Sequence, residues 1–215
     1  MTGRFISIRS TIFPERGLRI SADFWLLLAA AVIAAPLPLT AAVLLAAALH
    51  EGGHLIALRL FRVPVEGLRL GASGAVIHAR GARRLSYGRE LLVTLAGSAA
   101  NLLFAPPLAA LSTRIAWEWG FLFAGANVLL GVYNLLPIPP LDGGRALYLA
   151  VAYCFGPVAG EAAETAVGLF GAAALTALGA YLTAVYGGAL FLLAALGLLF
   201  GAVRQFALAK IPMSV

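Results

Sequence analysis

A long apolar run over residues 39–58 contains only three residues that can carry a charge or a proton, namely His50, Glu51 and His54. A run of this length and composition is typical of a helix that crosses a lipid bilayer. In such a helix the two histidines lie one turn apart on the same face, where both imidazoles can reach one metal ion. Ionisable residues are costly at this depth and usually serve a function. The sequence therefore predicts a metal site within a membrane, with Glu51 placed to activate water.

The composition of the whole chain supports a membrane protein. Of 215 residues, 62% are hydrophobic and only 11% are charged, which is more apolar surface than a soluble domain of this size can hide. We expect an all-α polytopic protein with about six transmembrane helices. The apolar spans are expected near residues 24–39, 40–61, 91–112, 119–137, 162–184 and 187–208.

The basic residues predict the orientation of these spans. If the spans alternate in direction, all of the fifteen Lys and Arg residues except Arg114 fall on one side or at its span ends. The positive-inside rule then places both termini, and the segments 62–90 and 138–161, in the cytoplasm. It also places the metal site toward the cytoplasmic side. The net charge of +6 is thus explained by membrane topology, and we expect no nucleic-acid partner.

Residues 63–80 follow a different pattern, in which apolar residues alternate with polar or small ones around a turn at residues 71–74. This alternation predicts a small β-hairpin instead of a span. Its open edge cannot face lipid, so the hairpin is expected at the membrane interface or covered by helices. The edge could pair with an extended peptide, or the hairpin could be a simple surface ribbon.

Two histidines are too few for a catalytic zinc site, which usually has three protein ligands and one open position. Most of the nine acidic residues lie at span ends or in polar segments, and Asp142 remains as the candidate. It follows a segment whose prolines cannot sustain a helix and precedes two glycines that permit unusual backbone angles. An unwound segment at this depth must be buried in protein or line a polar cavity. Asp142 is therefore the candidate third ligand, and it is expected on a segment where the helix is interrupted.

Two motifs together resemble a known family. His50-Glu51-Gly-Gly-His54 is followed some ninety residues later by Asn134-x-x-Pro-x-Pro-x-Leu-Asp142-Gly143. This pair is similar to the motifs of the site-2 protease family of intramembrane zinc metalloproteases, and residues 97–101 resemble that family's third-span motif. The resemblance covers a catalytic core of about residues 40–150.

The resemblance implies His50, His54 and Asp142 as ligands of one Zn²⁺ ion, and Glu51 as the catalytic base. It implies transmembrane-helix substrates that are cut within or near the bilayer. The short link at residues 112–118 and the small segment at 63–89 lead us to expect a compact form without a PDZ domain. From the end of the chain we also expect no nucleotide-sensing domain. Residues 1–215 would then form a single transmembrane metalloprotease domain.

Some roles stay open from the sequence. Asn101 and Asn134 are candidates for gripping the substrate backbone or the developing oxyanion, or for hydrogen bonding between helices. A membrane transporter or metal-ion carrier could use the same histidine and acid cluster, although it would be expected to string polar residues across several helices. A catalytically silent scaffold is disfavoured because the H-E-x-x-H motif is complete.

Overall fold

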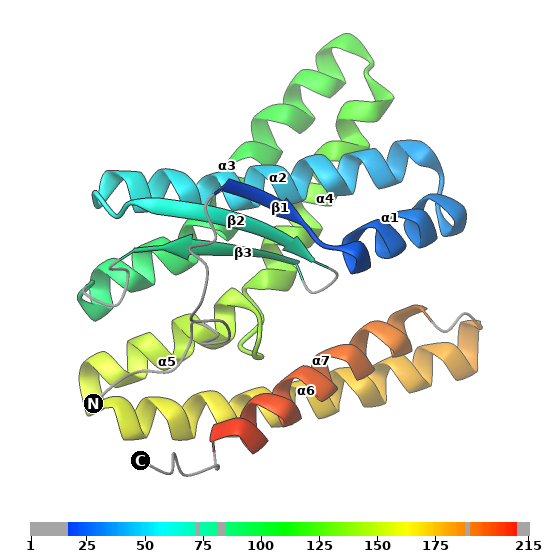
Figure 1. Ribbon diagram of the computed structural model, residues 1–215. Helices are drawn as coiled ribbons and strands as arrows, with labels where there is room; N and C mark the ends of the chain where they lie inside the picture. Colours follow the sequence, from blue (N-terminus) through cyan, green and yellow to red (C-terminus); the bar gives the residue numbers. More distant parts are fainter. Residues whose placement is uncertain (1–16, 72–73, 81–84, 188–189, 210–215) are drawn as a thin grey trace. The chain divides into compact units, whose positions relative to one another are not determined.

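The computed structural model describes residues 17–71, 74–80, 85–187 and 190–209 (Figure 1). Within these residues the chain forms helices and a small sheet, in two compact units. The first unit comprises Met1–Arg89 and Ala96–Gly131, and the second comprises Glu90–Leu95 and Val132–Val215. The helices are α1 (Ala22–Ala34), α2 (Leu37–Leu60), α3 (Tyr87–Ile115), α4 (Glu118–Asn134), α5 (Asp142–Phe155), α6 (Pro157–Tyr186) and α7 (Leu190–Ala209).

In the first unit, α2 and α3 pack with their backbones close together. A Cβ atom built on Gly53 would lie 2.5 Å from the carbonyl oxygen of Ala96 and 2.9 Å from Cβ of Ala100. The two helices therefore approach at a distance that only a glycine permits. A small core of Ala42, Ala46 and Ala126 continues this contact toward α4.

The predicted hairpin is present as β2 (Val65–Gly71) and β3 (Gly74–Ala79), which pair antiparallel with a register shift between Val65 and Gly67. Two of the four residues of its predicted turn, 72 and 73, lie outside the described residues. A third strand, β1 (Gly17–Ile20), pairs parallel with β2 and was not expected from the sequence. The result is a three-stranded sheet in the order β1-β2-β3 (Figure 1).

In the second unit, the helical chain breaks after Asn134 and resumes at Asp142, as the prolines predicted. The segment between them is buried in protein. Ile138 and Leu141 pack against Ala172 of α6 and against Leu198 and Ala202 of α7. The peptide bond between Pro139 and Pro140 is cis. The sequence did not predict that the chain would continue from Asp142 as the helix α5.

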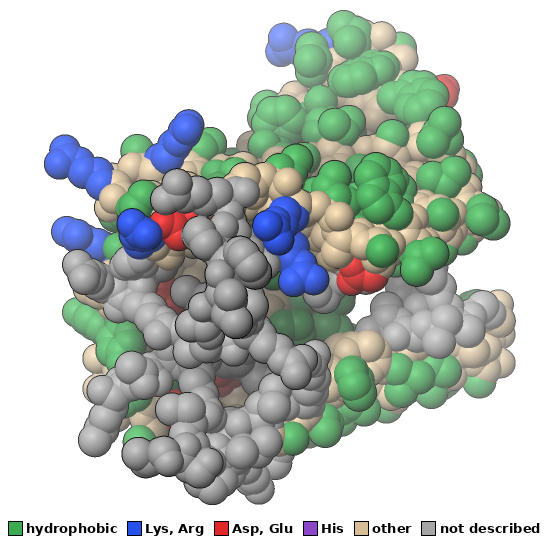
Figure 2. All heavy atoms as spheres, viewed as in Figure 1, with side chains coloured by type: hydrophobic (Ala, Val, Ile, Leu, Met, Phe, Trp, Pro, Cys, Tyr) green, Lys and Arg blue, Asp and Glu red, His purple; other side chains and the backbone are tan. Residues whose placement is uncertain are grey.

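The outer surfaces of the helices are strongly apolar, and Figure 2 shows hydrophobic side chains over much of the visible face. Ile33 is 87% exposed and Phe170 is 78% exposed. Three described helices, α2, α3 and α6, are long and apolar enough to cross a membrane. The chain is therefore an integral membrane protein. Each of the six predicted apolar spans overlaps a helix, although α1, with 13 residues, and α4, with 17, are shorter than the three membrane-length helices.

Candidate metal centre

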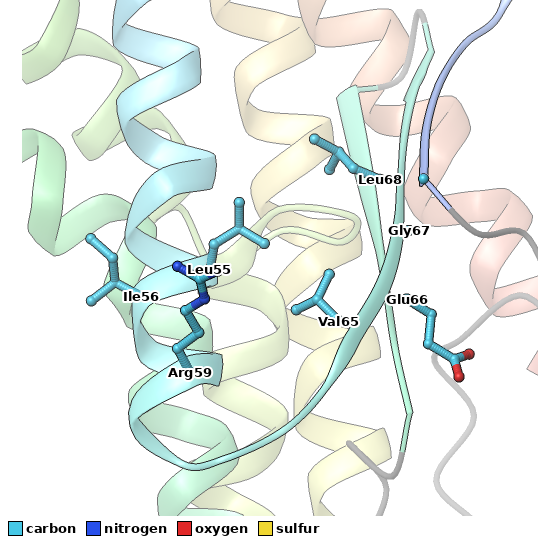
Figure 3. Close-up of a pocket in the computed structure, with 8 residues that line it drawn as sticks. Leu55, Ile56, Arg59, Val65, Glu66, Gly67 and Leu68 are labelled. Carbon is cyan, nitrogen blue, oxygen red and sulfur yellow. The ribbon is translucent and has the colours of Figure 1, made fainter.

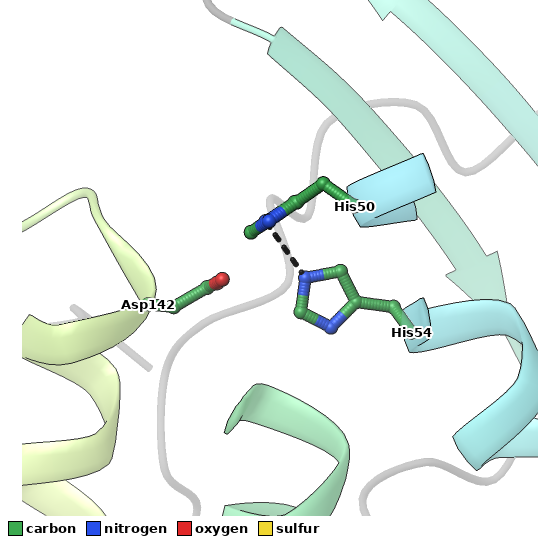
Figure 4. Close-up of side chains that lie close together, drawn as sticks. All are labelled: His50, His54 and Asp142. Carbon is green, nitrogen blue, oxygen red and sulfur yellow. Dashed lines mark hydrogen bonds between the residues drawn. The ribbon is translucent and has the colours of Figure 1, made fainter. Parts of the chain in front are cut away.

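His50 and His54 stand on successive turns of α2 and turn their imidazoles toward each other (Figure 4). Their Nε2 atoms are 3.1 Å apart, and the ring planes are inclined by 80°. His50 is buried, with 6% of its surface exposed, and His54 is partly buried. The helical spacing predicted from the sequence therefore brings both rings together within the first unit.

This arrangement fits two ligands of one zinc ion. With zinc–nitrogen bonds of 2.0–2.1 Å and tetrahedral angles, two ligand nitrogens lie about 3.3 Å apart. The observed separation of 3.1 Å is close to that value. In the absence of metal, one ring nitrogen can donate its proton to the other, so the pair is also stable as a hydrogen bond. The donor set and the spacing suit zinc.

Gly97 of α3 provides the space beside the two rings. A Cβ atom at this position would lie 2.8 Å from both Cε1 and Nε2 of His50, and closer still to Nε2 of His54. Any larger residue would have to push the imidazoles away from the place where their nitrogens converge. The sequence showed residues 97–101 only as a resemblance to a third-span motif, and it did not reveal that Gly97 faces the histidines.

Asn101 is completely buried one turn further along α3. Its Nδ2 donates a hydrogen bond to the backbone oxygen of Ala46 at 3.1 Å. Ala46 precedes His50 by one helical turn, so this bond ties α3 to the part of α2 that leads into the motif. The bond supports the helix-packing alternative for Asn101 over substrate contact.

Glu51 follows His50 on α2 and is partly buried. Asp142 and Asn134 belong to the second unit. Asp142 is the first residue of α5, where the partial positive charge of a helix N-terminus favours a carboxylate. Asn134 is the last residue of α4, at the start of the unwound segment.

A cavity of about 420 Å³ lies beside α2, and one of its lining residues, Leu55, directly follows His54 in the sequence. Leu55, Ile56 and Arg59 line it from the helix, and Val65, Gly67 and Leu68 line it from β2 (Figure 3). Glu66 points away from the helix and pairs with Arg80 at 2.7 Å. The walls are mainly apolar, and Arg59 and Glu66 are the charged residues that line them.

Membrane-length helices and a pair of converging imidazoles define an integral membrane protein with a candidate zinc centre. Comparisons with known proteins indicate which proteins the chain is similar to. Residues 114–178, which include Asp142 but not the histidines, match the family described as Peptidase family M50. The chain is also 34% identical over 114 residues to a protein of Mycobacterium tuberculosis, strains Erdman and H37Rv, that carries the name "Putative zinc metalloprotease Rip3".

That alignment covers 48% of this chain and 29% of the relative, so the chain matches less than a third of the relative's length. Among solved structures, the site-2 protease from Methanocaldococcus jannaschii is similar with a TM-score of 0.65 and 19% sequence identity. The similarity covers 92% of this chain and 94% of that one, and at this identity it shows that the fold is shared. The comparisons thus bear out the resemblance in two respects, the fold of a site-2 protease and the match of residues 114–178 to Peptidase family M50.

Proposed function

We propose that this chain is an intramembrane zinc metalloprotease that hydrolyses peptide bonds within or near the transmembrane helices of other membrane proteins. The observation that carries the proposal is the pair of Nε2 atoms 3.1 Å apart on a membrane-length helix. The space left by Gly97 beside both rings supports it, as does the match to a peptidase family.

In this proposal His50, His54 and Asp142 hold one Zn²⁺ ion per chain, as the resemblance of the two sequence motifs implies. Two imidazoles and one carboxylate form a ligand set found in zinc hydrolases, and they leave a coordination position open. Asp142 suits the role chemically, because it starts a helix directly after an unwound segment that is packed into protein. Unwound backbone of this kind is tolerated at membrane depth only where it is buried or lines a cavity.

When bound, zinc supplies a Lewis acid that polarises water and the carbonyl group of the peptide bond. Glu51 accepts the proton of the attacking water and returns it to the amide nitrogen that leaves. Asn134, beside the unwound segment, is proposed to hydrogen-bond the substrate backbone, whereas Asn101 is proposed to act in helix packing. The substrate helix must unwind at the cut, which predicts a preference for helix-breaking residues there.

The remaining parts of the proposal concern the whole chain. Residues 1–215 act as one catalytic domain with about six transmembrane spans. The distribution of Lys and Arg in the sequence supports cytoplasmic termini and an active site toward the cytoplasmic side.

The test is a Glu51→Gln variant of the full chain, purified in detergent and assayed with a single-span model substrate while its zinc content is measured. We expect zinc to be retained and cleavage to fall by at least about a hundredfold, because the variant lacks the base. Glu118→Gln is the matched control, since Glu118 is an exposed glutamate at the start of α4. Unchanged cleavage by the Glu51→Gln variant would refute the proposed protease activity.

A further inference from the structure

The charged pair of Glu90 and Arg145 has no part in the proposed reaction, yet it lies one helical turn from Asp142. We propose that this ion pair is a positioning device, which fixes the first turn of α5 so that the Asp142 carboxylate is oriented for zinc. The inference rests on the proposed function in that Asp142 is taken as a ligand. Both members of the pair belong to the second unit.

The contact is specific and sheltered. Nε of Arg145 donates to Oε1 of Glu90 at 3.1 Å, and Nη2 of Arg145 donates to the same oxygen. The two side chains are only 22% and 27% exposed. The guanidinium carbon also lies 4.6 Å from the ring centre of Tyr148, which is 3% exposed. Arg145 is therefore held both by an acid and by a buried aromatic ring.

The positions of the two charges show why each needs the other. Arg145 lies in the first turn of α5, where the helix dipole disfavours a cation. Glu90 lies in the first turn of α3, where the dipole favours an anion. The paired geometry compensates the unfavourable placement of Arg145, and removal of Glu90 would take the opposite charge away from a sheltered guanidinium. Because a cation is costly at this position, its presence points to a function there.

The spacing along α5 connects the pair to the proposed ligand. Asp142 and Arg145 are three residues apart and therefore lie on the same side of the helix. The glycines between them press against the unwound segment, because a Cβ on Gly144 would lie 2.7 Å from the backbone nitrogen of Pro139. The first turn of α5 is thus fixed by backbone packing at Gly144 and by the ion pair at Arg145. Together these contacts set the rotation of the turn that carries Asp142.

The experiment measures zinc affinity by competition with a chromophoric chelator, using the full chain in detergent. We expect Glu90→Gln and Arg145→Gln each to lower zinc affinity about tenfold to a hundredfold, as loss of the partners that orient metal ligands typically does. The double variant should be no weaker than the poorer single one, because both remove the same interaction. Arg145→Lys should restore part of the loss, since it keeps the charge but not the planar donor pair.

Cobalt-substituted protein provides a readout that a purely structural defect would leave unchanged. We expect the visible absorption of bound Co²⁺ to change in Glu90→Gln, while unfolding of the metal-free protein occurs under the same conditions as in the parent. Glu161→Gln is the matched control, because Glu161 is an exposed glutamate of the same unit. It should change neither zinc affinity nor the cobalt spectrum.

Asp142→Asn, measured in parallel, separates the two hypotheses. If Asp142→Asn loses zinc while Glu90→Gln and Arg145→Gln bind it normally, the positioning role is refuted and the proposed zinc site stands. If Asp142→Asn binds zinc as tightly as the parent, both the ligand assignment and the positioning role are refuted. Additive losses in the double variant would also overturn the inference, because they would show that the two side chains act separately.

Discussion

At the scale of single residues, Gly97 has the most direct influence on the zinc site. We expect Gly97→Ala to lower zinc affinity at least about tenfold, because the new methyl group would displace both imidazoles from the point where they converge. The affinity is measured by chelator competition. Gly125→Ala is the matched control, since Gly125 is a helical glycine with no atom within 4 Å of a built Cβ. Equal zinc binding by Gly97→Ala and the parent would contradict the placement of the histidines against α3.

The residues of the candidate site differ in how far the sequence could identify them. His50, Glu51 and His54 follow from local spacing alone, because a helix of known period fixes which residues share a face. Gly97 could not be identified in this way, since its role depends on which turn of α3 meets which turn of α2. The hydrogen bond from Asn101 to Ala46 depends on the same register, so the sequence left the role of Asn101 open.

At the scale of elements, the seam between α2 and α3 is controlled by one of two adjacent glycines. Gly53→Ala is expected to destabilise the protein by about 1–3 kcal/mol, because its methyl group would overpack the seam against Ala96 and Ala100. Gly52→Ala is the matched control, as a built Cβ at Gly52 meets no atom within 4 Å. Equilibrium unfolding in mixed detergent measures the difference. Equal stability of the two variants would contradict the close approach of these helices.

The elements that the sequence predicted are those with strong local patterns. The apolar runs predicted the helices, and Pro137, Pro139 and Pro140 predicted the break before Asp142. The helix α5 was missed because it opens with Asp-Gly-Gly, residues of low helix propensity. In the structure these glycines fit against the unwound segment instead. The strand β1 was missed because its parallel pairing with β2 joins residues about fifty positions apart, and no local pattern encodes such a pairing.

At the scale of the whole molecule, the predicted topology can be tested with single cysteines in a Cys154→Ser background, since Cys154 is the one cysteine of the sequence. A membrane-impermeant maleimide should label Arg69→Cys only in vesicles whose cytoplasmic face is outward. It should label Arg114→Cys only in vesicles of the opposite orientation. Both positions are exposed. Labelling of both cysteines from the same side would contradict the assignment from the positive-inside rule.

The glycine beside the imidazoles has a consequence for engineering. At most metal sites, room for a bulkier ion can be made by trimming a neighbouring side chain, but Gly97 has no side chain to trim. The space on this side of the site is therefore already at its maximum, which is set by the main chain of α3, held against α2 at Gly53. Any substitution at Gly97 can therefore only reduce the space beside the imidazoles, so an attempt to admit a larger ion has to act at another residue.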